Sequence, residues 1–136
     1  MSDLSLFSLE GKTMIVTGAS KGIGKAIAME SARAGADLVI GSRTMADLEL
    51  VAADIRNLGR QCHCFTVDVA NVASIQTFVD QAITAKGGID ILVNNAGYNK
   101  IMPILEVTEE DYDYIIDVNL KSVFFGCQAI VKHMIE

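Results

Sequence analysis

The chain has 136 residues, of which 51% are hydrophobic, and 11 Lys and Arg against 17 Asp and Glu give it a formal net charge of −6. This length allows one domain, which buries about two-thirds of the surface that the unfolded chain exposes, so a core needs neither disulfides nor a metal. The acidic excess and scattered basic residues disfavour nucleic acid or an anionic membrane as the main partner, because both require clustered Lys and Arg.

The amino-terminal segment and the cysteines indicate a compartment. Residues 1–7 contain Asp3 where a secretory signal has its basic region, and no uninterrupted apolar run approaches the roughly 20 residues that span a bilayer. We therefore expect a cytoplasmic protein whose three cysteines are reduced thiols. Cys62-His63-Cys64 predicts no metal site, because alternation along a strand turns His63 away from both cysteines and no second cluster completes four ligands.

Apolar runs and helical periodicities alternate along the chain with short connections. The elements predicted in chain order are strand 12–17, helix 23–34, strand 37–42, helix 44–58, strand 62–69, helix 72–85, strand 89–94 and a helical segment from Thr108 onward. Thr44 is the predicted cap of the second helix, and Ile23, Ile27 and Ala34 are predicted to share the apolar face of the first. Glycines stand where three helices are predicted to stop: Gly35, Gly59 and Gly87-Gly88.

The predicted strands are apolar runs without the alternation of half-exposed strands. Such runs, each followed by a helix, predict an α/β fold in which a parallel sheet is covered by helices on both faces. The only proline, Pro103, lies in the loop after the fourth strand, and nothing marks a domain boundary. We therefore expect residues 1–136 to form one domain.

A glycine-rich turn, Gly18-Ala-Ser-Lys-Gly-Ile-Gly24, joins the first strand to the first helix. Gly18 allows a sharp turn, Gly22 lets the backbone approach a pyrophosphate, and Gly24 lets the helix pack closely on the sheet, with its free N–H groups facing the phosphates. The alternative is a tight turn without a ligand, but three glycines cost conformational entropy that a plain turn does not require. The predicted ligand-binding residues of this turn are Gly18, Ser20, Lys21, Gly22, Ile23 and Gly24.

Four motifs together resemble the short-chain dehydrogenase/reductase family. They are the Gly-x-x-x-Gly-x-Gly spacing, Asp68-Val69 after the third strand, Asn94-Asn95-Ala96-Gly97 at the end of the fourth strand, and Asp117-Val118-Asn119 in the last helix. The resemblance runs from about Leu9 to the end of the chain. It implies a Rossmann-like three-layer fold, present as its first four strands and their helices, in an oxidoreductase that acts on a small-molecule carbonyl or alcohol and forms homo-oligomers.

The tip of the second strand, Gly41-Ser42-Arg43, bears on the choice between NADP and NAD. A 2′-hydroxyl is recognised by an acid at this tip and a 2′-phosphate by basic residues. The only nearby acid identified from the sequence, Asp37, stands at the other end of the strand. Arg43 and Lys21 match the basic positions of NADP-using family members, so we expect NADP(H), although both side chains are alternatively solvated surface charges.

The resemblance assigns further cofactor contacts. It implies that Asp68 accepts a hydrogen bond from the adenine amino group, with Val69 beside the ring. It also implies that Asn94 ties the central sheet together. Ala96 and Gly97 are implied to line the cofactor ribose, and Asn95 is also expected to bind the cofactor.

The catalytic residues of the family are incomplete in this sequence. The resemblance implies a Tyr-x-x-x-Lys pair, a serine, and an asparagine that holds a proton-relay water in a locally distorted helix. Asn119 matches that asparagine, although a lone buried asparagine is alternatively a packing residue. The residues four positions after Tyr98, Tyr112 and Tyr114 are Met102, Ile116 and Val118. We expect the missing residues from segments after Glu136, so this chain, about half of the enzyme, is expected to be inactive alone.

Two alternatives to a partial enzyme remain open. One is a non-catalytic dinucleotide-binding or interaction module. The other is an unstable fragment with an open edge at the fourth strand and an uncovered helix face, formed by Val123, Phe124, Ile130 and Val131. Residues 98–107 are expected to form one wall of a substrate site, but their side chains do not indicate which substrate binds. The family resemblance alone suggests 3-oxoacyl thioesters or sugar alcohols.

Overall fold

The computed structural model describes residues 5–136. Its four strands form one parallel sheet in the order β3-β2-β1-β4. The strands are β1 (Thr13–Thr17), β2 (Asp37–Ser42), β3 (Cys62–Thr66) and β4 (Ile91–Val93). Residues 1–4, which include part of the segment used for the targeting argument, lie outside the described residues.

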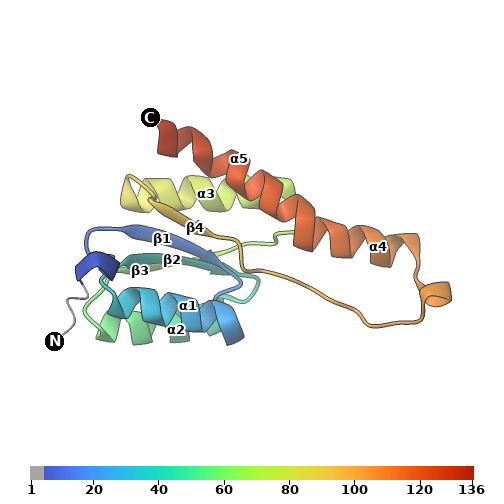
Figure 1. Ribbon diagram of the computed structural model, residues 1–136, viewed down its shortest axis with the longest axis horizontal. Coiled ribbons are helices and arrows are strands. Elements are labelled where there is room, and N and C mark those ends of the chain that lie inside the picture. The colour runs from blue at the N-terminus through green and yellow to red at the C-terminus, as the bar shows by residue number, and fades with distance from the viewer. Residues whose placement is uncertain (1–4) are drawn as a thin grey trace.

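Helices cover both faces of the sheet, which confirms the predicted three-layer Rossmann-like fold (Figure 1). One face is covered by α1 (Gly22–Arg33) and α2 (Met45–Asn57), and the other by α3 (Val72–Lys86) and α5 (Ser122–Ile135). Two short 3-10 helices complete the fold with α4 (Glu109–Ile116): η1 (Ser5–Phe7) and η2 (Ile104–Glu106).

The outer strands are shorter than the predicted ranges 62–69 and 89–94. The register of β3 with β2 ends at the pair Ser42↔Thr66, where β2 itself ends. β4 pairs with β1 over only three residues, and Asp90, just before it, accepts a hydrogen bond at Oδ2 from the backbone N–H of Thr13, 2.8 Å away. The backbone N–H of Asp90 also donates to the carbonyl oxygen of Thr13 at 3.0 Å, so a backbone bond and a side-chain bond together hold this end of β4 to β1.

Two apolar layers hold the helices to the sheet. Met14 and Val16 of β1 join the cluster beneath α1 and α2, whereas Ile15 joins the cluster beneath α3 and α5, because successive strand residues point to opposite faces. Cys62 is buried in the first cluster with Cys64 packed against it, as the predicted alternation requires.

Two predictions about apolar faces were wrong. Ile23 was placed on the buried face of α1, yet it is 75% exposed, because it lies in the first turn beyond the end of β1. Ile130 was placed on an uncovered face of the last helix, yet it is 1% exposed and packs in the cluster with α3. Phe124 and Val131 are exposed as predicted.

The carboxyl-terminal helical segment runs past the end of the sheet. Thr108 caps α4, its Oγ1 accepting a hydrogen bond from the backbone N–H of Asp111 at 3.1 Å, whereas Thr44 at the start of α2 makes no capping bond with its side chain. A π-helical turn (Asp117–Lys121) joins α4 to α5, and α4 projects beyond the sheet (Figure 1).

By length and composition alone, the continuous helix Glu109–Ile135 is long and apolar enough to cross a membrane. This is weak evidence, because the core helix of a soluble protein meets the same criteria. α5 packs against α3 within the fold.

Candidate functional site

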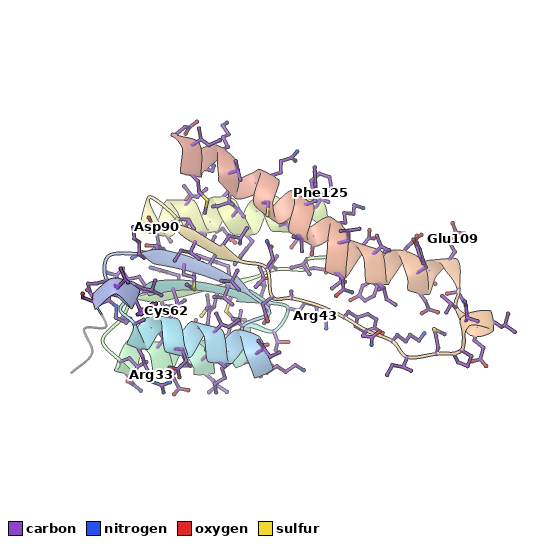
Figure 2. The ribbon with its side chains drawn as sticks, in the orientation of Figure 1. Arg33, Arg43, Cys62, Asp90, Glu109 and Phe125 are labelled. Carbon is purple, nitrogen blue, oxygen red and sulfur yellow. The ribbon has the colours of Figure 1, made fainter. Side chains whose placement is uncertain are left out.

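A cavity of about 300 Å³ opens at the carboxyl edge of the sheet. Figure 2 shows Arg43 at this end of the sheet, with Asp90 toward the opposite end of the sheet. Ligands of open α/β sheets bind in the crevice at this edge, where the connections leave the strands. The cavity brings together ten of the predicted residues: Gly18, Ser20, Lys21, Ser42, Arg43, Asp68, Val69, Asn95, Ala96 and Gly97.

The three other predicted turn residues, Gly22, Ile23 and Gly24, do not line the cavity. Gly22 has a φ of +58°, a conformation that favours glycine, and a Cβ added there would meet nothing within 4 Å. A Cβ on Gly24 would lie 2.3 Å from both the carbonyl oxygen of Gly18 and Nδ2 of Asn95. The predicted close packing at Gly24 is therefore confirmed, and this residue shapes the turn from behind.

The amino terminus of α1 provides backbone donors beside the cavity. Lys21 occupies the N-cap position with extended backbone and makes no capping hydrogen bond with its side chain. The first N–H groups of a helix have no partners within the helix, and the helix dipole favours an anion there. This arrangement suits a phosphate group.

Hydrogen bonds from Asn95 join the ends of β1 and β4. Its Nδ2 donates to the carbonyl oxygens of Thr17 at 3.0 Å and Gly18 at 3.1 Å. The hydroxyl oxygen of Thr17 accepts from the backbone N–H groups of Asn95 and Ala96, both at 3.2 Å. These bonds fix two of the connections that line the cavity.

The prediction that Asn94 ties the central sheet together was wrong, because neighbouring strand residues point in opposite directions. The Asn94 side chain turns to α5, where its Nδ2 donates to Sγ of Cys127 at 3.6 Å. A Cβ on Gly126 would lie 2.9 Å from Oδ1 of Asn94. Asn94 therefore packs under α5, and Asn95 makes the bonds between strands.

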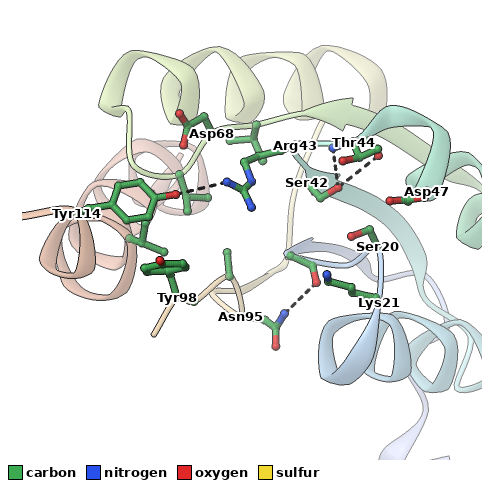
Figure 3. A pocket seen from close by; sticks show the side chains of 16 residues that line it. Ser20, Lys21, Ser42, Arg43, Thr44, Asp47, Asp68, Asn95, Tyr98 and Tyr114 are labelled. Carbon is green, nitrogen blue, oxygen red and sulfur yellow. Dashed lines mark hydrogen bonds between the residues drawn. The ribbon is translucent and has the colours of Figure 1, made fainter. Parts of the chain in front are cut away.

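The tip of β2 places an exposed arginine over the cavity. Nη1 of Arg43 donates to the hydroxyl oxygen of Tyr114 at 3.4 Å, and Figure 3 shows these side chains pointing toward one another. Asp37 lies at the opposite end of β2, bound to Lys86. The expectation that Asp37 is the only nearby acid was nevertheless wrong, because Asp47 in the first turn of α2 also lines the cavity.

Asp68 presents its carboxylate in a turn after β3. Its Oδ1 accepts a hydrogen bond from the backbone N–H of Ala70 at 3.0 Å, and its own backbone N–H donates to the hydroxyl of Ser74 at 3.0 Å. The turn holds Asp68 and Val69 at the cavity wall.

Asn119 lies in the π-helical turn, which confirms the predicted distortion of the helix. Its Oδ1 accepts from the backbone N–H of Tyr98 at 3.1 Å, and its Nδ2 donates to the Tyr98 carbonyl at 2.6 Å and to that of Ile115 at 2.9 Å. Asn119 does not line the cavity, but its side chain holds the adjacent loop at Gly97 and Tyr98.

The segment 98–107 leads from the cavity to α4 with several exposed apolar side chains, among them Ile101 and Leu105. Nζ of Lys100 bonds Oδ1 of Asp111 at 2.6 Å across this segment. That hydrogen bond, with a second from Thr108, holds the pKa of Asp111 below its usual value, and it raises the pKa of Lys100. The pair ties the loop to the start of α4.

Five lining residues were not predicted as site residues from the sequence, namely Thr44, Asp47, Val67, Tyr114 and Val118, and Tyr98 was expected only as part of the substrate wall 98–107. Tyr114 and Val118 are four residues apart, the spacing that places helical side chains on one face. That spacing was a usable signal, but only the docking of α4 shows that the face turns to the cavity.

The fold and the site define a nucleotide-binding α/β protein, with a glycine turn and a helix amino terminus at the carboxyl edge of a parallel sheet. A family model described as short chain dehydrogenase matches residues 12–136. The chain therefore belongs to the short-chain dehydrogenase family.

Known proteins of this family share both sequence and structure with the chain. It is 42% identical over 132 residues to the 2-dehydro-3-deoxy-D-gluconate 5-dehydrogenase of Escherichia coli (strain K12), covering 97% of this chain and 51% of that protein. A short-chain type dehydrogenase/reductase from Mycobacterium marinum superposes with a TM-score of 0.93 at 37% identity, covering 99% of this chain and 55% of that one.

A metagenomic short-chain oxidoreductase, solved in complex with NADP, superposes with a TM-score of 0.89 at 34% identity, covering 93% of this chain and 58% of that one. The chain thus spans about half the length of the curated relatives it matches.

Proposed function

We propose that this chain is the cofactor-binding part of an NADP-dependent oxidoreductase that reduces a ketone or oxidises a secondary alcohol. The observation that carries the proposal is a single cavity that joins the glycine turn at the amino terminus of α1 to two cationic side chains, Lys21 and Arg43. NADP carries a pyrophosphate and a 2′-phosphate. The glycine turn at the helix amino terminus suits the pyrophosphate, and the two cationic side chains suit the 2′-phosphate.

The residues present fit NADP in their chemistry. The uncapped start of α1 suits the pyrophosphate, Lys21 and Arg43 suit the 2′-phosphate, and Asp68 with Val69 suits the adenine. When bound, NADPH supplies the hydride of the reaction. The NADP complex of the metagenomic relative supports the same cofactor.

The residues of this chain account for cofactor binding, but they do not include the Tyr-x-x-x-Lys pair of the family. None of its three tyrosines has a lysine four residues later, and a tyrosine acts as a proton donor only when a nearby cation lowers its pKa. We propose that Asn119 contributes to catalysis in the whole protein by holding the loop at Tyr98. The substrate is then a small carbonyl or alcohol compound bound beyond this loop.

We also propose that the protein works in the cytoplasm as a homo-oligomer. Apolar side chains exposed on α5, among them Phe124 at 63% and Ile135 at 79%, support association. Sedimentation measured over a range of protein concentrations tests the homo-oligomer. A chain that stays monomeric at every concentration contradicts that part of the proposal.

The second candidate is a non-catalytic dinucleotide-binding or interaction module, favoured by the lack of a Tyr-x-x-x-Lys pair in this sequence. Assays of NADPH oxidation with diverse ketones, on this chain and on any longer protein that contains it, separate the two. Turnover by a longer protein supports the enzyme, whereas turnover by this chain contradicts the proposal that its catalytic pair is missing.

Fluorescence titration of the purified chain with NADPH and NADH tests the cofactor. We expect NADPH to bind at least tenfold more tightly, because Arg43 and Lys21 gain a phosphate partner. Arg43→Ala should remove most of this preference, while Lys132→Ala, far along α5, should not change it. Tighter binding of NADH would overturn the NADP assignment, and no binding of either would overturn the nucleotide site.

A further inference from the structure

The contact between Arg43 and Tyr114 crosses the cavity. Arg43 follows β2 and Tyr114 belongs to α4, and both residues line the cavity. Nη1 of Arg43 donates to the Tyr114 hydroxyl oxygen at 3.4 Å, the long end of the hydrogen-bond range. Figure 3 shows the two side chains reaching toward each other beside Asp68.

The Tyr114 ring is itself held in place. It packs edge-to-face on Tyr98, with ring centroids 4.9 Å apart and an interplanar angle of 76°, the geometry that aromatic pairs prefer. Asn119 in turn bonds both the N–H and the carbonyl of Tyr98. The Tyr114 hydroxyl is therefore a fixed acceptor on the wall opposite β2.

We propose that Tyr114 is a positioning residue for Arg43 and thereby strengthens the preference for a 2′-phosphorylated nucleotide; this inference rests on the proposed NADP-binding function. An exposed arginine side chain loses conformational entropy when it binds a phosphate. An acceptor that already restrains the guanidinium reduces this entropy loss on binding. A guanidinium has five N–H donors, so one bond to Tyr114 leaves the others for a phosphate.

The effect of Tyr114 is specific to one group of the ligand. The 2′-phosphate is the part of the nucleotide assigned to Arg43, whereas Asp68 and Val69 are assigned to the adenine and Ala96 to the ribose side. Loss of the Tyr114 hydroxyl should thus weaken 2′,5′-ADP and leave 5′-AMP unchanged. A residue that only supports the fold would change the two affinities together.

Calorimetric titration of the 136-residue chain with 2′,5′-ADP and 5′-AMP tests the inference, with Tyr114→Phe as the variant. This change keeps the ring and its contact with Tyr98. We expect 2′,5′-ADP to bind roughly three- to tenfold more weakly, the usual size of one net hydrogen bond, and 5′-AMP to bind as before. Tyr112→Phe, an exposed tyrosine on the same helix and outside the cavity, is the matched control.

The same titrations in an Arg43→Ala background show whether Tyr114 acts through Arg43. We expect Tyr114→Phe to have no further effect there. An unchanged or increased 2′,5′-ADP affinity in Tyr114→Phe, or an equal loss for both ligands, would overturn the inference while the proposed function stands. A wild-type chain with no preference for 2′,5′-ADP would overturn both.

Discussion

Asn95 and Gly24 show how single residues shape the cofactor turn. The Asn95 amide bonds two consecutive carbonyls at the end of β1, and the backbone of Gly24 comes so close to this amide that no Cβ fits between them. The Asn95 amide and the absence of a side chain at Gly24 together allow α1 to begin close to the ends of β1 and β4.

Gly24→Ala should destabilise the fold by about 1–3 kcal/mol, because the added methyl forces backbone to shift in a packed region. Its new Cβ would lie 2.3 Å from both Asn95 Nδ2 and the Gly18 carbonyl oxygen. Urea denaturation measures the change in the free energy of unfolding. Gly88→Ala, where the new Cβ meets nothing within 4 Å, is the control, and equal effects of the two variants would contradict this account.

Asp47 places a negative charge beside the basic residues of the cavity. Asp47→Asn should therefore raise the affinity for 2′,5′-ADP roughly two- to fivefold, the range of an exposed charge pair. Titration at low and high salt measures it, and the gain should shrink at high salt because ions screen the repulsion. The control is Asp54→Asn on the same helix, which removes a charge that pairs with Lys25; a fall in affinity for Asp47→Asn would contradict the prediction.

The π-helical turn is the element that couples α4 to the loop after β4. A π-turn adds one residue to a helical turn and is common at functional sites. Here the π-turn contains Asn119, whose side chain forms hydrogen bonds with the backbone of Tyr98. Asn119 therefore ties the helical segment to the loop after β4, in addition to the bond between Lys100 and Asp111.

Asn119→Ala should release this loop. Hydrogen exchange at the Tyr98 amide, whose N–H now bonds Asn119 Oδ1, should become at least tenfold faster because the amide loses its acceptor. Exchange within β1 should not change. Asn99→Ala, an exposed neighbour, is the control, and unchanged exchange at Tyr98 would show that other contacts hold the loop.

At the scale of the whole molecule, a charge network closes the end of the sheet opposite the cavity. Oδ2 of Asp37 accepts a hydrogen bond from Lys86 of α3 at 2.9 Å, and its Oδ1 lies 3.2 Å from Nη2 of Arg60. Burial alone would raise the pKa of Asp37, but the bonds from Lys86 and Gln61 and the charges of Lys86 and Arg60 together lower it.

Asp37→Asn should cost about 1–3 kcal/mol at pH 7, because it leaves nearly buried Lys86 without its charged partner. A lowered pKa in the folded state gives stability that is present above the unfolded value near 3.9 and is lost as pH falls through the folded value. The difference between wild type and variant should therefore shrink below about pH 4. Urea denaturation from pH 7 to pH 3 measures it, with Asp80→Asn as the control; a constant difference would exclude the linkage.

The sequence by itself determined the order of elements, the parallel sheet and most of the cavity. Apolar runs and stop glycines are local signals, and the ends of parallel strands necessarily gather at one edge, so residues such as Arg43 and Asp68 could be placed together from their positions alone. The predicted helix distortion at Asn119 was equally local in origin.

Only the tertiary structure decided which side chains meet. It assigned the bonds between strands to Asn95 and turned Asn94 toward α5, buried Ile130, and brought Asp47 and Tyr114 to the cavity. These outcomes depend on strand phase, helix rotation and the docking of α4, which long-range packing sets and no local pattern encodes.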